Sequence, residues 1–401
     1  MRVAMLSHLA AESAPTGAEH SLALLARGLV RRGHEVTVAT PGRWALTGEL
    51  QAAGVEMVSI QVRSCWLVQY GSQPIARQVV RAARFAAPDP GFGMLQRWLR
   101  RSQVDVAYVN CLPHLRGAAA ARSAGLPVVW HLREILPPGP RRRWFARRLA
   151  RDATHIVAVS EAVAEWLRQE GLGDRVEVVY NGVDAPSRLI DRERARKAVG
   201  LPTDGVVFGF FSQLVEHKGA LDFIRAAHAA AAQAPALHFL VAGDGPAHFL
   251  SRLRREIEGG AVAGRIHLVP PQDTIWSLLA AVDAVALPTL WPDPLPRVVM
   301  EATAVGLPVV AYGDGGVPEM VVAGETGLIL DSGDWRSLAE AMLQLARDPD
   351  LRSALGEAGR RRAGSLFGVD RHVERMEALL LEAASGGVGS AVGGGHNPSD
   401  A

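Results

Sequence analysis

Three charged residues in the second half of the chain have the types and positions needed to hold a phosphorylated, hydroxyl-bearing ligand. Lys218 stands directly before Gly219, and it is one of two lysines in a chain that otherwise uses arginine for its positive charge. An ammonium group there can neutralise a phosphate. Asp293 and Glu301 lie eight positions apart, and a carboxylate can accept hydrogen bonds from two adjacent sugar hydroxyls. The ordinary alternatives are a solvated lysine, an N-cap for Asp293 and an exposed first-turn acid for Glu301.

Three glycines occupy positions where a backbone could approach such a ligand. Gly17 lies between the first apolar segment and a helical pattern, where the free N–H groups of a helix start attract anions. A tight turn is the ordinary alternative for this glycine. Gly315 and Gly316 follow a later apolar segment and free backbone amides for close approach. The chain has neither GxGxxG nor GxxxxGK[ST] at a strand-to-helix turn, which disfavours a nicotinamide-dependent oxidoreductase and a P-loop enzyme.

The elements that must position these residues alternate between short apolar strands and amphipathic helices. This alternation predicts βαβ units with parallel sheets, in which ligands bind at the carboxyl ends of the strands. We expect two doubly wound α/β domains with a boundary near residue 185. The expected strands of the first domain are 2–7, 34–40, 104–110, 127–132, 155–160 and 176–184. Those of the second are 205–212, 236–245, 265–270, 281–289, 306–313 and 327–333.

Length and composition agree with two soluble domains. The chain has 401 residues, 48% of them hydrophobic and 21% charged, and a single core seldom grows to this size. The net charge of +2 gives no reason to expect nucleic-acid binding. Cys65 and Cys111 predict free thiols in a reducing compartment. The start reads as a strand rather than a secretory signal, and no apolar run reaches membrane-spanning length. We therefore expect a cytoplasmic protein.

Two local patterns each leave two interpretations open. The basic helix expected over 141–153 could contact anionic lipid at the inner membrane face, or it could be a solvated arginine-rich helix. The sequence DPD at 348–350 spells a motif that binds metal in some enzymes, but between two helices it reads as a surface turn. The glycine- and serine-rich stretch 385–401 is predicted to be disordered.

A set of short motifs appears in a characteristic order along almost the whole chain. They are TGAEHSLALLARGLVRRGHEVTVAT, VSEAVAEWL, YNGVD, LVEHKG, AGDGP, DPLPRVVMEATAVGLPVVA, GGVPEMV and GETGLIL. Over roughly residues 1–384 the chain resembles the GT-B-fold retaining glycosyltransferases of the family-4 group. The resemblance implies two Rossmann-like domains facing a central cleft. Residues 1–184 would form the acceptor domain and 185–369 the nucleotide-sugar domain, with helix 370–384 packing back on the first.

The resemblance also implies a reaction. A sugar would pass from a nucleotide-diphosphate donor to a hydroxyl acceptor with retention of the α configuration. The departing diphosphate would take the acceptor's proton, and no metal or other cofactor would be required. The acceptor could be a small molecule, a metabolite or a lipid-linked compound, and the protein a monomer or a homodimer. The donor sugar, its base and the acceptor are not readable from the sequence.

Roles for individual residues follow from the same resemblance. Lys218 would bind the donor's diphosphate, with a backbone amide of Gly17. Asp293 would contact the donor sugar near its 3- and 4-hydroxyls, and Glu301 would hold the ribose hydroxyls. The base would rest against backbone near Val269. Backbone amides lining the sugar-phosphate site would come from around Arg297, Val298, Gly315 and Gly316.

Several positions depart from the family pattern. Gln213 stands where the family usually has arginine, which removes one cation from the leaving group. Asp293 replaces a glutamate and is one methylene shorter, and Pro296 replaces a glycine and has no N–H to donate. The family often has a catalytic-site histidine where this chain has Arg133, with His131 two residues earlier on the same face. Either of the two could enter the cleft, and Arg133 could partly replace the missing cation.

These departures keep two other functions open. One is another GT-B chemistry, such as nucleotide-sugar epimerisation or phosphorolysis, and an epimerase would need no acceptor. The other is a nucleotide-sugar-binding partner subunit that has lost activity. Such a subunit would bind a donor without hydrolysing or transferring its sugar.

Overall fold

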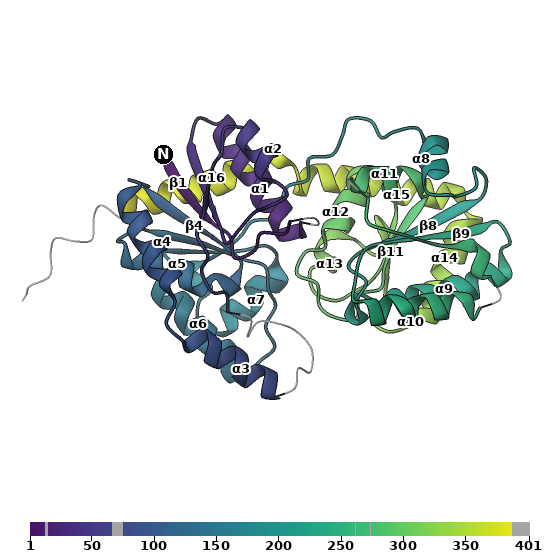
Figure 1. Ribbon diagram of the computed structural model, residues 1–401. Helices are drawn as coiled ribbons and strands as arrows, with labels where there is room; N and C mark the ends of the chain where they lie inside the picture. Colours follow the sequence, from purple (N-terminus) through teal and green to yellow (C-terminus); the bar gives the residue numbers. More distant parts are fainter. Residues whose placement is uncertain (13–14, 66–74, 261, 273, 387–401) are drawn as a thin grey trace, which may run out of the picture. The chain divides into compact units, whose positions relative to one another are not determined.

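The computed structural model describes residues 1–12, 15–65, 75–260, 262–272 and 274–386. The chain divides into two compact units (Figure 1), one made of Met1–Gly182 with the segment from Val369 onwards, the other of Val183–Gly368. The sequence places its boundaries at 184/185 and 369/370. Most of the tail predicted to be disordered, residues 387–401, lies outside the described residues.

Unit 1 is built on a parallel sheet of seven strands. Their order is β3-β2-β1-β4-β5-β6-β7. All residues of β4 and β5 are buried, as expected for central strands covered by helices on both faces. The strands are β1 (Arg2–Leu6), β2 (Glu35–Thr40), β3 (Glu56–Ser59), β4 (Val106–Asn110), β5 (Val128–Leu132), β6 (His155–Ala158) and β7 (Val176–Val178).

The helices of unit 1 include one from the far end of the sequence. They are α1 (Gly17–Arg31), α2 (Thr47–Ala52), α3 (Ile75–Ala86), α4 (Pro90–Arg101), α5 (Leu115–Ser123), α6 (Pro140–Asp152), α7 (Glu161–Gln169) and α16 (Val369–Gly386). The apolar residues of α16 recur three and four positions apart, which gives the helix one buried face. That face packs against α1, β4 and β5 in a core that includes Val373, Met376, Leu380 and Ala383. Within unit 1, Gly182 lies against Val369, where a side chain would meet the Val369 Cα at 2.9 Å.

Unit 2 repeats the same plan with six parallel strands. Their order is β10-β9-β8-β11-β12-β13. The strands are β8 (Val206–Phe211), β9 (Leu237–Ala242), β10 (Ile266–Val269), β11 (Ala284–Leu287), β12 (Val309–Tyr312) and β13 (Gly327–Leu330). The helices are α8 (Arg192–Ala198), α9 (Ala220–Gln233), α10 (Ala247–Glu258), α11 (Ile275–Ala281), α12 (Arg297–Ala304), α13 (Val317–Met320), α14 (Trp335–Arg347) and α15 (Pro349–Leu366). Phe208, Phe210, Phe223 and Phe239 lie fully buried in the core between the sheet and α9.

Both sheets confirm the prediction of two Rossmann-like α/β units, and each expected strand is present. The strand order determines where a ligand can enter. In each sheet the order reverses beside the first strand, between β1 and β4 in unit 1 and between β8 and β11 in unit 2. A doubly wound sheet opens a crevice at such a switch point, at the carboxyl ends of its strands.

Candidate functional site

In unit 2, Lys218 lies at the carboxyl edge of the sheet, directly at the switch point. It ends a short 3₁₀ turn, Glu216–Lys218, between β8 and α9. The next residue, Gly219, has a φ of 79° and lies so close to the Pro288 carbonyl that a Cβ there would collide with it. The Leu290 N–H donates to the His217 carbonyl at 2.9 Å. The loops after β8 and β11 are therefore joined, and glycine at 219 is what lets them approach.

Asp293 reaches across these joined loops to Lys218. The Lys218 Nζ donates to the Asp293 Oδ2 at 2.5 Å, and the two side chains are 21% and 13% exposed. Neither ordinary alternative describes them: Lys218 is not a solvated lysine, and the N-cap of α12 is Pro296 rather than Asp293. An ammonium held by one carboxylate at a switch point keeps donors for a second anion, because Lys has three.

The loop after β12 also contacts Asp293. Gly316 N–H donates to the Asp293 carbonyl at 2.8 Å. Gly315 has a φ of 64°, and a Cβ on it would overlap the Asp293 backbone. The Gly316 amide predicted to face a ligand is therefore already used to fix Asp293 in place. Together these contacts link the carboxyl ends of three adjacent strands, β8, β11 and β12.

Glu301 lies on the buried side of α12, and the exposed first-turn acid expected as an alternative is wrong. It is 7% exposed, and burial raises the pKa of its carboxyl above the usual range, against the opposing effect of Arg297. The Arg297 Nη2 donates to the Glu301 Oε1 at 2.8 Å, across one helical turn. Helix α12 begins at Arg297, so this residue and Val298 carry first-turn amides for which a helix itself supplies no acceptor.

Two of the predicted residues lie at the same edge and, in the described part of the chain, make no hydrogen bond with Lys218 or Asp293. Gln213 is exposed in the loop after β8, and its carbonyl accepts the N–H of Val215. Val269 ends the edge strand β10, which β9 separates from β8. The predicted residues of unit 2 thus form two contacting groups: Lys218 and Asp293 with Gly315 and Gly316, and Arg297 with Glu301 on α12, where Val298 follows Arg297.

In unit 1, Gly17 is the exposed first residue of α1, and a buried glutamate shapes the loop before it. Glu19 is 1% exposed. Its two carboxylate oxygens accept the N–H groups of Ala11 and Thr16, both at 2.8 Å. The chain on either side of residues 13–14 is therefore held to the first turn of α1, and the position of Gly17 depends on Glu19.

Arg133 lies at the carboxyl end of β5 and is held by neutral side chains. Its Nε donates to the Asn110 Oδ1 at 3.0 Å, its Nη1 to the Asn181 Oδ1 at 2.6 Å, and its Nη2 lies 3.5 Å from the His131 Nδ1. The side chain is half-buried. Arg133 therefore lies where a ligand of unit 1 could reach it.

His131, in contrast, is fully buried beneath Arg133. It is 0% exposed, and its Nδ1 is 2.8 Å from the hydroxyl of Tyr108. Burial lowers the pKa of His131 well below its ordinary value, and the charges of Arg133 and His372 act in the same direction. The imidazole is therefore neutral.

The residues that hold this arrangement were not singled out from the sequence. Asn110 ends β4, Asn181 belongs to the motif YNGVD, and Glu19 lies in TGAEHS. Asn110 and Asn181 are 1% and 4% exposed. A polar residue as the last residue of a buried strand, at the edge where ligands bind, is the signal that could have identified Asn110.

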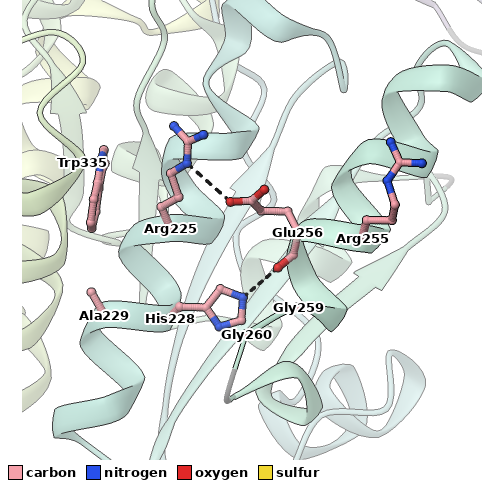
Figure 2. A pocket seen from close by; sticks show the side chains of 8 residues that line it. All are labelled: Arg225, His228, Ala229, Arg255, Glu256, Gly259, Gly260 and Trp335. Atoms are coloured by element: carbon pink, nitrogen blue, oxygen red, sulfur yellow. Dashed lines mark hydrogen bonds and ion pairs between the residues drawn. The ribbon is translucent and has the colours of Figure 1, made fainter.

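Other features lie apart from these groups of residues. Unit 2 has a surface hollow of about 530 Å³ on α9, α10 and α14. Its lining includes Arg225, His228, Glu256 and Trp335, which are labelled in Figure 2. It contains none of the predicted residues. Asp348 accepts the N–H of Leu351 as the N-cap of α15, so the DPD sequence begins a helix.

The arginine-rich helix α6 buries its apolar side, including Phe145 and Leu149, within unit 1. Only its basic face is left for the lipid contact that the sequence suggested. No helix in the described part of the chain combines the length and the apolar character that a membrane span requires.

Comparisons with known proteins identify the family of the chain. A model of glycosyl transferases group 1 matches residues 191–362, and one of glycosyltransferase family 4 matches residues 15–186. A GDP-mannose-dependent monoacylated alpha-(1-6)-phosphatidylinositol monomannoside mannosyltransferase of Corynebacterium glutamicum is 28% identical over 75% of this chain and 82% of its own length. The D-inositol 3-phosphate glycosyltransferase of Mycobacterium tuberculosis is 34% identical over 63% of this chain, but the match spans only 52% of that protein.

Among solved structures, HepE of Anabaena in complex with UDP-glucose has a TM-score of 0.79 and 24% identity, covering 95% of this chain and 100% of that one. The two matched models together leave only the chain ends and a short linker uncovered. The chain belongs to the family-4-type, nucleotide-sugar-dependent glycosyltransferases of GT-B fold.

Proposed function

We propose that the chain transfers a sugar from a nucleotide-diphosphate donor to a hydroxyl acceptor, with retention of the α configuration and without a metal. The observation that carries the proposal is the Lys218–Asp293 pair, 2.5 Å apart at the switch point of unit 2. A diphosphate at that edge would meet the Lys218 ammonium, and the sugar beyond it would meet the Asp293 carboxylate. The buried Glu301, one helical turn into α12, would accept the ribose hydroxyls.

The role of these residues would be electrostatic. As the bond to the sugar breaks, negative charge grows on the diphosphate, and fixed donors stabilise it most where water is excluded. Lys218 is such a donor because Asp293 holds its ammonium in one place. The diphosphate would take the acceptor's proton, so the protein needs no separate base at the reacting hydroxyl.

Unit 1 would supply the acceptor site. The two relatives named above act on inositol compounds that carry a phosphate, according to their names. Arg133, a half-buried cation at the carboxyl edge of unit 1, suits substrates of this charge. We assign to His131 the positioning of Arg133, because a fully buried imidazole cannot touch a substrate.

Replacement of Lys218 by alanine tests the proposal directly. Losing one charge-stabilising contact costs about 3 kcal/mol, so turnover of the Lys218→Ala variant should fall about a hundredfold. The matched control is Lys197→Ala, which removes the other lysine from the exposed surface of α8. It should turn over as the wild type does. Near-wild-type turnover of Lys218→Ala would contradict the proposed role.

A thermal-shift panel of nucleotide sugars, with and without EDTA, would identify the donor and test the need for a metal. NMR of the product would then read the anomeric configuration. Conversion of the donor without an acceptor would indicate an epimerase, and donor binding without conversion would indicate a non-catalytic subunit. The uncharged, exposed Gln213 would contribute to such a loss of activity, because it leaves the diphosphate with one cation fewer.

A further inference from the structure

Within the ranges that the structure describes, the side chain of Arg133 contacts neutral groups only, although the charge of the neighbouring Glu134 carboxylate also acts on it. Its side-chain partners, Asn110, Asn181 and His131, are all neutral, and the Tyr108 hydroxyl that also lies beside it is neutral too. Among the described residues it makes no ion pair. The neighbouring Glu134 carboxylate instead accepts the backbone N–H groups of Leu112 and Arg133 itself. A half-buried guanidinium that is hydrogen-bonded to neutral acceptors alone is stabilised further by an anion that binds it directly.

The geometry leaves donors for such an anion. Arginine has five N–H groups in a fixed plane, and the contacts with Asn110, Asn181 and His131 involve one on each of its three nitrogens. The neighbours also fix the plane of the guanidinium, because Asn110 and Asn181 hold two different nitrogens, at 3.0 and 2.6 Å. A guanidinium fixed in this way loses little entropy when it binds an oxyanion.

The groups around Arg133 also favour the binding of an anion. The Asn110 Nδ2 donates to the carbonyl of Ala18 at 3.3 Å, so the same asparagine joins Arg133 to the first turn of α1. That helix has 15 residues and begins with the exposed Gly17. The positive end of its dipole favours negative charge, and the Glu19 carboxylate in its first turn is bound to the amides of Ala11 and Thr16. Beneath Arg133, His131 stays neutral, so it adds no competing positive charge.

We propose that Arg133 is the specificity-determining residue of an oxyanion subsite on unit 1, one that binds a phosphoryl group of a substrate. The proposal rests on the proposed function, because it concerns a substrate of that reaction. The phosphoryl group can come from the donor's diphosphate or from a phosphate on the acceptor. The chemistry at Arg133 is the same for both, and binding experiments separate them.

The experiment uses the full chain and three variants. Arg133→Gln removes the charge and keeps a hydrogen-bonding side chain, and Arg133→Lys keeps the charge without the fixed plane. Arg147→Gln removes an exposed arginine from α6 as the matched control. Circular dichroism checks that each variant is folded. The probes are UDP, GDP, ADP and dTDP with the corresponding nucleosides, and inorganic phosphate added to the free protein and to its nucleotide complex.

Two results support the subsite and identify its ligand. If the donor supplies the anion, Arg133→Gln weakens nucleoside diphosphate binding about ten- to a hundredfold and leaves nucleoside binding unchanged. Inorganic phosphate then competes with the nucleotide. If the acceptor supplies it, nucleotide binding is unchanged, and inorganic phosphate binds the nucleotide complex of the wild type but not that of Arg133→Gln. In both cases Arg133→Lys retains part of the affinity.

One result overturns the proposal. If Arg133→Gln binds both the nucleotides and inorganic phosphate as Arg147→Gln does, Arg133 holds no oxyanion, and the proposed function stands or falls with Lys218 alone. If no nucleotide binds the wild type, the proposed function fails. The phosphate titration of the free protein then still decides whether Arg133 binds an anion.

Discussion

At the scale of single residues, Gly315 is the position where the smallest change should have the largest effect. It has a φ of 64°, and a Cβ there would overlap the backbone of Asp293. Gly333 shares the left-handed conformation, with a φ of 83°, but has nothing within 4 Å of its Cβ position. Gly333→Ala should therefore cost about 1 kcal/mol, for backbone strain alone.

Gly315→Ala should add the displacement of Asp293 to this strain. We expect it to destabilise unit 2 by about 2 kcal/mol or more and to weaken donor binding, because Lys218 loses its partner. Urea unfolding and a donor titration measure both effects against Gly333→Ala. Equal losses in the two variants would show that the approach of Gly315 to Asp293 has no consequence.

The residue types of this site could be predicted from the sequence, but their contacts could not. Lys218 and Asp293 were each assigned to a ligand, and nothing in their spacing shows that they pair, since they are 75 positions apart. Their pairing depends on the order of β8 and β11 in the sheet. Likewise, His131 and Arg133 share a face of one strand, and only the packing of α16 shows that one is buried and the other is not.

At the scale of elements, the loop between β1 and α1 depends on one carboxylate. Glu19 accepts two backbone N–H groups and is buried. In Glu19→Gln the amide NH₂ of glutamine would face one of these donors, and a buried donor without an acceptor costs about 1–3 kcal/mol. We expect a lower melting temperature and faster hydrogen exchange at the amides of Ala11 and Thr16.

Glu12→Gln is the matched control for this loop, because Glu12 is exposed and lies in the same segment. It should exchange as the wild type does. Unchanged exchange at Ala11 and Thr16 in Glu19→Gln would mean that the loop is held by other contacts.

The pattern of apolar residues in the sequence predicted the central strands well, because central parallel strands are continuous apolar runs. It did not predict β3, Glu56–Ser59, whose residues are only half-buried or exposed. This strand lies at the edge of the sheet, where one side needs no apolar cover, and so its sequence carries no strong pattern. None of the family motifs found in the sequence lies in the stretch 42–103, which contains this strand.

At the scale of the whole molecule, acid should act on unit 1 through its buried histidines. Burial lowers the pKa of His8 to about 4 and that of His114 to about 3, against an ordinary value of 6.5. Between pH 6.5 and these values the unfolded chain binds protons that the folded protein does not. The free energy of unfolding is therefore undiminished by these histidines above pH 6.5. Below that pH it falls by about 1.4 kcal/mol per pH unit for each such histidine.

Glu134 changes the pH dependence of the unfolding free energy in the opposite direction. Burial raises the pKa of its carboxyl, so the folded protein takes up that proton at a higher pH than the unfolded chain does. Comparing variants removes this contribution. His114→Gln should reduce the dependence of unfolding free energy on pH, between pH 6 and pH 4, by about 1.4 kcal/mol per pH unit. His248→Gln, at an exposed position of unit 2, should leave it unchanged. Urea unfolding at a series of pH values measures the slope, and equal slopes in the two variants would mean that His114 is protonated in the folded protein.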